Sequence, residues 1–231
     1  MDPTVSARPY VLLSCAMSVD GYIDDAAGQR LILSDAEDLD RVDEVRASCD
    51  AILIGAGTIR RDDPRLLVNS AARRARRTAE GLSEYPVKVT ITGAGLSRDF
   101  KFFNTGGEKI VYCPASAAGK IRTELGNAAT VAGLPSPLDF GDILDDLGQH
   151  GIGRLMVEGG SSIHTQFLAQ NLADEIQLAV APFLVGQPEA PRFVSSGSFP
   201  QDSGHRMIVA EVRQVGDMVL TRYLTSARPL V

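Results

Sequence analysis

The chain has 231 residues, 44% of them hydrophobic and 23% charged, which is typical of a soluble globular protein and excludes a wholly disordered or collagen-like chain. This length predicts one large domain or at most two small ones. The net charge of −6 argues against broad nucleic-acid binding, because that function needs a basic surface.

Short apolar runs alternate with helical patterns along most of the chain. The runs that predict strands are Tyr10–Ala16, Ala51–Gly55, Val87–Thr92, Lys109–Cys113 and Arg154–Val157. The segments that predict helices are Ser34–Cys49, Ala71–Glu80, Ala115–Gly126, Asp139–Gln149 and Ser161–Asn171. Strands that alternate with helices favour an α/β fold, in which helices cover both faces of a mostly parallel sheet in three αβα layers.

The first predicted helix carries the clearest boundary signal. Ser34 followed by Glu37 has the spacing of a capping box, and Asp35 and Asp38 suit the positive end of a helix. We interpret the acidic residues of this helix as its solvated face.

The end of the chain has a different pattern. Asp174–Val185, Arg206–Val215 and Asp217–Leu224 predict three strands without a helix between them, and Gly216 joins the last two. Antiparallel strands at the end of a parallel sheet make a mixed sheet. Residues 186–204, rich in Pro, Ser and Gly, predict a surface loop.

We expect a single domain over residues 8–225, with residues 1–7 and 226–231 as tails. The three cysteines are far apart and form no Cys/His cluster, so we expect a reduced, cytoplasmic protein without a metal site. Leu12–Cys15 resembles a lipoprotein cleavage box, but the apolar run before it is shorter than the roughly 7–15 residues of an export signal. No segment approaches the ~20 apolar residues of a membrane span.

Three glycine-bearing turns follow predicted strands: Ile54–Thr58, Thr92–Gly95 and Glu158–Ser162. Glycine lets a ligand approach the backbone closely, and a helix start offers free N–H groups to a phosphate. Because ligands of α/β sheets bind at the carboxyl ends of the strands, the three turns together predict a nucleotide site, although each alone also suits a structural connection. The absence of GxGxxG and Walker A sequences excludes an ordinary Rossmann protein and a P-loop NTPase.

Carboxylates supply the second group of candidates. Asp20 before Gly21 also suits a turn, and Asp62-Asp63 before a proline also suits a helix end. Glu158 ends a predicted buried strand, where burial of a carboxylate is costly unless it faces a cleft, so we interpret it as functional. His164, one turn into the following helix, is in a position to touch a cofactor, but we interpret it as a surface histidine.

Five blocks of sequence, in this order, resemble the pyrimidine reductases of riboflavin biosynthesis. The blocks are Ala16–Gly21, Ala51–Leu66, Val157–Gly160, Asp174-Glu175 and Ala181–Gly186. This family includes the reductase domain of a bifunctional deaminase-reductase and stand-alone diaminopyrimidine reductases. The resemblance covers residues 8–225 and implies a dihydrofolate-reductase-like fold and a homodimer, for which Ile176–Val185 and the terminal hairpin are the candidate surface.

The resemblance implies NADPH-dependent reduction of a ribosylaminopyrimidine to its ribitylamino form. The substrate would be 5-amino-6-ribosylaminouracil 5′-phosphate or its 2,5-diamino relative, and hydride would reach C1′ of the opened, imine form of the sugar. By motif, the cofactor-binding residues would be Met17, Thr58, Asp62, Gly93, Gly160, Ser161 and Ser162. Arg46, Leu66 and Glu158 would contact the substrate, and Glu158 would orient or protonate the reacting amine. We expect the cofactor's 2′-phosphate near Gly93–Ser97 or a nearby arginine.

Three positions depart from the family pattern. Ser14, Leu31 and Asn69 stand where the bifunctional enzymes often carry lysine, tryptophan and arginine. The loss of arginine at 69 argues against a phosphorylated substrate, unless Arg65 or the basic cluster Arg73–Arg77 replaces it; this cluster also suits a solvated helix face. The alternatives are a dihydrofolate-reductase-like enzyme acting on a pterin and a non-catalytic nucleotide- or pterin-binding protein of the same fold.

Overall fold

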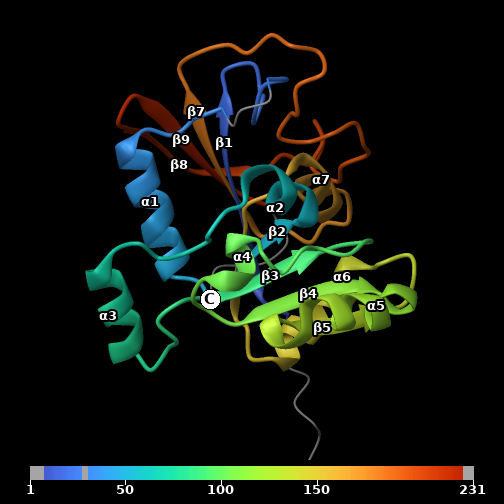
Figure 1. The fold of residues 1–231 in the computed structure, drawn as a ribbon. Helices are drawn as coiled ribbons and strands as arrows, with labels where there is room; N and C mark the ends of the chain where they lie inside the picture. Colours follow the sequence, from blue (N-terminus) through green and yellow to red (C-terminus); the bar gives the residue numbers. More distant parts are fainter. Residues whose placement is uncertain (1–7, 28–30, 226–231) are drawn as a thin grey trace, which may run out of the picture. The chain divides into compact units, whose positions relative to one another are not determined.

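The computed structural model describes residues 8–27 and 31–225, so the expected tails lie outside the described residues. The chain divides into two compact units (Figure 1). The first unit is Met1–Tyr10 with Asp43–Met156, and the second unit is Val11–Val42 with Val157–Val231. Each unit is therefore assembled from two separate stretches of the chain.

The first unit contains a sheet in the order β5-β4-β3-β2-β6. Its strands are β2 (Ala51–Gly55), β3 (Val87–Ile91), β4 (Lys109–Pro114), β5 (Thr130–Leu134) and β6 (Arg154–Val157). Strands β2 to β5 pair in parallel. The core of β2 is entirely apolar, since Ile52, Leu53 and Ile54 are at most 1% exposed. Burial on both faces is typical of a central parallel strand.

Helices connect the strands of the first unit. They are α2 (Ala56–Asp62), α3 (Ala71–Ala79), α4 (Lys101–Asn104), α5 (Ala115–Leu125) and α6 (Phe140–Gln149). Helix α5 lies along β4 and β5 (Figure 1) and buries Ala118, Ile121 and Leu125. A short 3₁₀ turn, Gly126–Ala128, follows α5.

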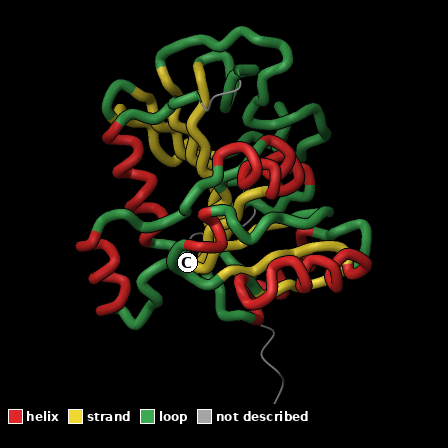
Figure 2. Tube along the Cα trace, in the orientation of Figure 1, coloured by secondary structure: helices red, strands yellow, loops and turns green. Residues whose placement is uncertain are grey.

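The second unit contains strands in the order β1-β7-β9-β8. They are β1 (Tyr10–Ser18), β7 (Glu175–Ala181), β9 (Met218–Leu224) and β8 (Ile208–Val215). β1 and β7 are parallel, whereas β7, β9 and β8 are antiparallel. The unit also holds α7 (Ser161–Ala169) and the start of α1 (Ala36–Ala47). Figure 2 shows the chain between β7 and β8 as a long loop.

The predicted α/β fold, with mostly parallel strands and antiparallel strands at the end of the chain, is confirmed. Three elements were not expected: α2, α4 and β5. The strand predicted over Asp174–Val185 is shorter, because β7 ends at Ala181 and Pro182 has no N–H to continue the ladder.

Helix α1 differs from its predicted form in two respects. The helix starts at Ala36, and Oδ1 of Asp35 accepts the N–H of Asp38 at 2.8 Å, so Asp35 and not Ser34 caps it. Its acidic residues are not all solvated: Asp38 and Asp43 are 0% and 4% exposed. Each has a buried partner, since Arg41 donates to Asp38 at 2.7 Å and the N–H of Ser70 donates to Asp43 at 3.1 Å.

The basic cluster Arg73–Arg77 on α3 is only in part the solvated face that was expected, because Arg76 is exposed whereas Arg77 is buried. Arg77 is 2% exposed and donates to three backbone carbonyl oxygens at 2.7–2.9 Å. Arg73, Arg74 and Arg76 form ion pairs with carboxylates of α1 and Glu84. The cluster therefore fastens α3 to its surroundings in the first unit.

All three cysteines are buried. In residues 8–27 and 31–225, no helix has both the length and the apolar character of a bilayer span.

Candidate active site

The turn after β6 shows why a glycine occupies position 159. Glu158 follows the last residue of β6 and is half-buried. Gly159 has φ +100°, and a Cβ atom there would lie 2.8 Å from Cε1 of His164. The Gly159–Gly160 peptide bond is cis, and Gly160 is the N-cap of α7. A side chain at 159 would thus be excluded by its backbone conformation and by the histidine ring.

His164 is fully buried, so its interpretation as a surface residue is wrong. Its ring fills the space above Gly159 and lies 5.0 Å from the ring of Phe193. Burial lowers the pKa of His164 to about 4, which makes the ring neutral at physiological pH. The histidine shapes the Glu158–Gly160 turn by packing and is not a proton donor at neutral pH.

The start of α7 offers backbone donors. In the described part of the chain, the N–H groups of Ser161 and Ser162 have no acceptor, as is usual in the first turn of a helix. The Ser161 hydroxyl donates to the carbonyl oxygen of Arg192, so it organises the loop after β7. Ser162 is exposed. Free backbone N–H groups of this kind bind phosphate at the N-termini of helices.

Near the end of β1, Met17 is half-buried and pairs with Val180 of β7. Asp20 organises the turn that follows: its carboxylate accepts from the Ser18 hydroxyl at 2.6 Å and from the N–H of Gly186 at 2.8 Å. The hydrogen bond from Ser18, together with those from backbone N–H groups, holds the pKa of Asp20 below its usual range. Asp20 thus has the structural role that the sequence left open.

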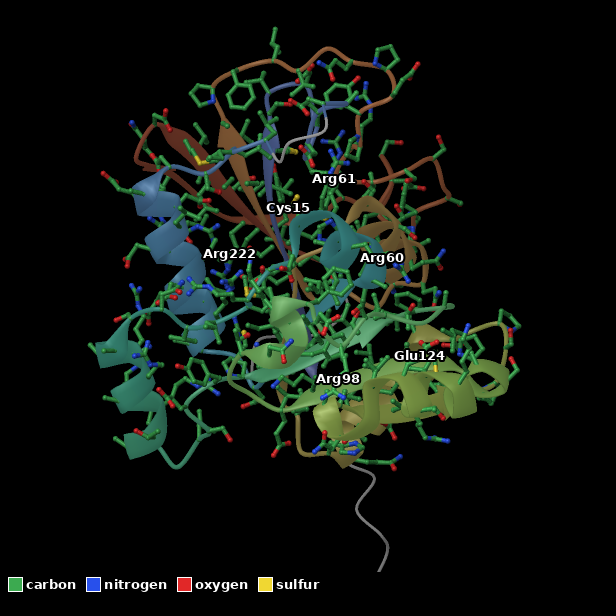
Figure 3. The ribbon with its side chains drawn as sticks, in the orientation of Figure 1. Cys15, Arg60, Arg61, Arg98, Glu124 and Arg222 are labelled. Atoms are coloured by element: carbon green, nitrogen blue, oxygen red, sulfur yellow. The ribbon has the colours of Figure 1, made fainter. Side chains whose placement is uncertain are left out.

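Ser14, one of the departures from the family pattern, is buried in β1 beside Gln177 of β7. Gln177 accepts from Arg41 at 2.8 Å and pairs with Arg222 of β9 (Figure 3). Arg222 donates to Glu175 at 2.7 Å. Gln177, the β7 partner of Ser14, therefore has the guanidinium group of Arg41 as its hydrogen-bond donor and Arg222 as its partner on β9. Sequence reasoning missed them, because the strand pairing that brings them together joins distant segments.

In the first unit, Thr58 and Asp62 lie on α2, both half-buried. Arg60, on the same helix, donates to the carbonyl oxygen of Gly95 at 3.1 Å and approaches Oγ1 of Thr92 at 3.4 Å (Figure 3). Gly93 is exposed, and a Cβ atom there would meet nothing within 4 Å. The structure thus brings a guanidinium group against the loop after β3, where a 2′-phosphate was expected.

Glu124 of α5 approaches the same loop, and a Cβ atom at Gly95 would lie 2.0 Å from its Oε2 (Figure 3). The loop after β3 therefore has a positive group from α2 and a negative group from α5 as neighbours. Neither was predicted from the sequence.

The loop 63–70 holds the expected substrate residue Leu66, which is buried and has φ +46°. Arg46, the other expected substrate residue in this unit, donates to the carbonyl oxygen of Leu67 at 3.2 Å. The N–H of Asn69 donates to Asp43, and Oδ1 of Asn69 accepts from Arg65 at 3.4 Å. Arg46 of α1 thus contacts the loop that carries Leu66, and Arg65 is exposed in the same loop.

The predicted site residues fall into two groups. Thr58, Asp62, Gly93, Arg46 and Leu66 lie in the first unit, and Met17, Glu158, Gly160, Ser161 and Ser162 lie in the second. Among residues 8–27 and 31–225 there is no group of three or more His, Cys, Asp or Glu side chains arranged for a metal ion.

Residues 9–221 match the model of the RibD C-terminal domain. The chain belongs to this family. A relative from Archaeoglobus fulgidus, named 2,5-diamino-6-ribosylamino-4(3H)-pyrimidinone 5′-phosphate reductase, is 34% identical over 194 residues, covering 83% of this chain and 89% of the relative. A relative of the same name from Methanothermobacter thermautotrophicus is 37% identical over 190 residues, covering 81% and 84%. The family expected from the sequence is thereby confirmed.

Solved structures agree on the fold. The deaminase/reductase of Thermotoga maritima superposes with a TM-score of 0.77 at 24% identity, covering 94% of this chain. This chain corresponds to 57% of the length of that bifunctional protein. A pyrimidine reductase-like protein from Corynebacterium diphtheriae gives a TM-score of 0.77 at 20% identity, with 95% and 93% of the two chains covered.

Proposed function

We propose that this protein is an NADPH-dependent reductase that converts a ribosylaminopyrimidine 5′-phosphate to its ribitylamino form. The observation that carries the proposal is the half-buried Glu158 at the end of β6, directly before the glycine turn and the open N–H groups of α7, in a chain whose relatives are named as this reductase. This arrangement combines a carboxylate for the substrate with backbone donors for a phosphate.

The residues present fit a phosphorylated dinucleotide. The N–H groups of Ser161 and Ser162 suit a phosphate, Gly160 leaves the helix start open, and Met17, Thr58, Asp62 and Gly93 are the further contacts that we propose. When bound, NADPH supplies the hydride that reduces C1′ of the imine. The protein's own contribution is to hold the two molecules in contact and to supply charge and a proton.

We propose that Glu158 orients the ribosylamine nitrogen or gives it a proton as C1′ is reduced. The substrate would also contact Arg46 and Leu66 of the first unit. Among the candidate phosphate contacts, Arg73, Arg74 and Arg76 are engaged with carboxylates and Arg77 with carbonyl groups, whereas Arg65 is exposed. We therefore propose Arg65 as the arginine that replaces the one absent at Asn69.

The direct test is NADPH oxidation by the purified protein with the two ribosylaminopyrimidine phosphates and with dihydrofolate. We expect turnover with a pyrimidine phosphate. Turnover with dihydrofolate alone would favour a pterin reductase, and cofactor binding without any turnover would favour a non-catalytic binding protein.

Glu158→Gln tests the proposed role of the carboxylate. Because it keeps the shape but removes the acid, we expect the single-turnover rate to fall about 10²–10⁴-fold with little change in NADPH affinity. Glu189→Gln, an exposed change in the second unit, is the matched control. Unchanged turnover in a well-folded Glu158→Gln protein would remove this residue from the mechanism.

Arg60→Gln tests cofactor preference. If Arg60 faces the 2′-phosphate, its loss should weaken NADPH binding about tenfold or more and leave NADH binding nearly unchanged, because charge-assisted hydrogen bonds are the strong ones. Arg61→Gln removes the same charge from the same helix and is the control. Equal affinity of the wild-type protein for NADH and NADPH would contradict the proposal.

We also propose a cytoplasmic homodimer in which both units form one reductase domain over residues 8–225. β7 lies between β1 and β9 and is mostly buried, so the exposed Ile208, Val209 and Val212 of β8 are the better candidates for the dimer surface. Light scattering tests the dimer and should give twice the chain mass of 24.6 kDa.

The other two proposals have their own tests. Fractionation of cells should recover the protein with cytoplasmic markers. Calorimetry should show a single unfolding transition if both units form one domain.

A further inference from the structure

The first unit contains a lysine that the proposed chemistry does not use. Lys88 of β3 is 0% exposed, and in the described part of the chain it forms no ion pair. Its Nζ donates to Oγ1 of Thr105 at 2.6 Å and approaches the carbonyl oxygen of Phe102 at 3.4 Å. Burial of an amine costs free energy unless the amine is hydrogen-bonded, and these two contacts offset part of that cost.

Thr105, the C-cap of α4, connects Lys88 to the loop 63–70. Its hydroxyl lies 3.1 Å from the carbonyl oxygen of Arg65 and 2.7 Å from that of Lys101. Lys88 donates to the hydroxyl oxygen, so the amine occupies one of its lone pairs and the hydroxyl hydrogen remains for the two carbonyl oxygens. Lys88 thereby orients the hydroxyl so that its hydrogen is shared between the carbonyl oxygen of Lys101 in α4 and that of Arg65 in this loop.

The carbonyl group of Arg65 belongs to the peptide unit that leads into Leu66. Leu66 has φ +46° and Asp63 has φ +41°, a region that residues other than glycine rarely adopt. Such conformations persist where the surroundings hold them in place. The N–H of Lys101 donates to Asp63 at 2.6 Å and Arg46 holds the carbonyl of Leu67 at 3.2 Å, so Thr105 supplies the contact between these two points.

We propose that Lys88 and Thr105 are positioning residues that fix the Arg65–Leu66 peptide unit and thereby present Leu66 to the substrate. This inference rests on the proposed function, because that function makes Leu66 a substrate contact. Neither residue touches the substrate. Their effect on catalysis passes through the backbone of the loop.

The first measurement needs no substrate. Trypsin cleaves after Arg65, which is exposed, only when the loop opens. Thr105→Val removes the hydroxyl and keeps the shape, so we expect cleavage of the Arg65–Leu66 bond, identified by mass spectrometry, to accelerate about tenfold. Lys88→Met should have a similar effect, and Thr105→Ser should restore the wild-type rate. Thr123→Val, which removes an exposed helix hydroxyl, is the control.

The second measurement separates positioning from stability. We expect Thr105→Val to raise the KM for the pyrimidine substrate about tenfold, with kcat and NADPH affinity within twofold of wild type and rescue by Thr105→Ser. An unchanged cleavage rate would overturn the inference, and so would an unchanged KM in an active variant that is cleaved faster. If the wild-type protein reduces no pyrimidine, the proposed function fails, and the cleavage rates still show whether Lys88 and Thr105 hold the loop.

Discussion

The buried amine of Lys88 makes the stability of the protein depend on pH in a defined direction. Desolvation and the nearby charges of Lys109 and Arg46 lower the pKa of Lys88 from 10.5 to about 7. Between these two values the unfolded chain carries a proton that the folded chain has released. Stability therefore rises with pH across this window, since the cost of burying the charged amine is present in full below pH 7 and disappears toward pH 10.5.

The size of the effect follows from the width of the window. A group protonated only in the unfolded chain adds about 1.4 kcal/mol per pH unit to the free energy of unfolding. From pH 7.5 to pH 9.5, Lys88 should contribute about 2.5 kcal/mol. Lys88→Met keeps the length of the side chain without the amine, so the variant lacks this contribution.

Urea denaturation of both proteins at several pH values isolates the effect of Lys88, because the other groups titrate in both. We expect the difference in free energy of unfolding, wild type minus variant, to grow by about 2.5 kcal/mol between pH 7.5 and pH 9.5. Parallel pH profiles would show that the amine keeps an ordinary pKa in the folded protein and would refute the reasoning.

Three further predictions concern single contacts. Arg77→Met leaves the buried carbonyl groups of Ala47 and Cys49 and the carbonyl group of Ser83 without their donor, and it should lower the free energy of unfolding by about 3 kcal/mol in urea titrations; a loss under about 1 kcal/mol would contradict this account. Gly159→Ala, strained by φ +100° and by the ring of His164, should cost about 2 kcal/mol or more, whereas Gly57→Ala, with open space around it, should cost far less. Tyr112→Phe removes a hydroxyl that donates at 2.6 Å to a carboxylate of α6 and should cost about 1–2 kcal/mol, measured in the same way.

The alternation of strands and helices was predictable because short runs rich in apolar and β-branched residues, such as β2, alternate with helical patterns. Elements with a weaker local signal were missed. β5 is the edge strand of the sheet in the first unit; it is half-exposed and lacks an apolar pattern. α4 is a single helical turn. α2 contains Gly57 and two β-branched residues, a sequence with low helix propensity, and it is anchored by the buried Ile59.

The environment of the charged residues was not predictable. Arg77 donates to the carbonyl of Cys49, 28 positions away in sequence, and Lys88 depends on Thr105, 17 positions away. Read from their neighbours in sequence alone, these residues are hydrophilic, and a position on the protein surface is therefore predicted for them. The glycine turn at Glu158 was recognisable because its chemistry is local, whereas the guanidinium groups that contact Gly95 and Gln177 depend on tertiary contacts.

Because the three cysteines are buried, their reaction with a thiol reagent reports local opening of the structure around each of them. Cys15 belongs to the second unit and is 8% exposed, while Cys49 and Cys113 belong to the first and are 0% exposed. Burial also raises the pKa of each thiol, so a thiol reagent meets little reactive thiolate in the closed state. The rate at which each cysteine is alkylated thus reports the opening of its surroundings, and a single native sample yields separate opening free energies for the two units.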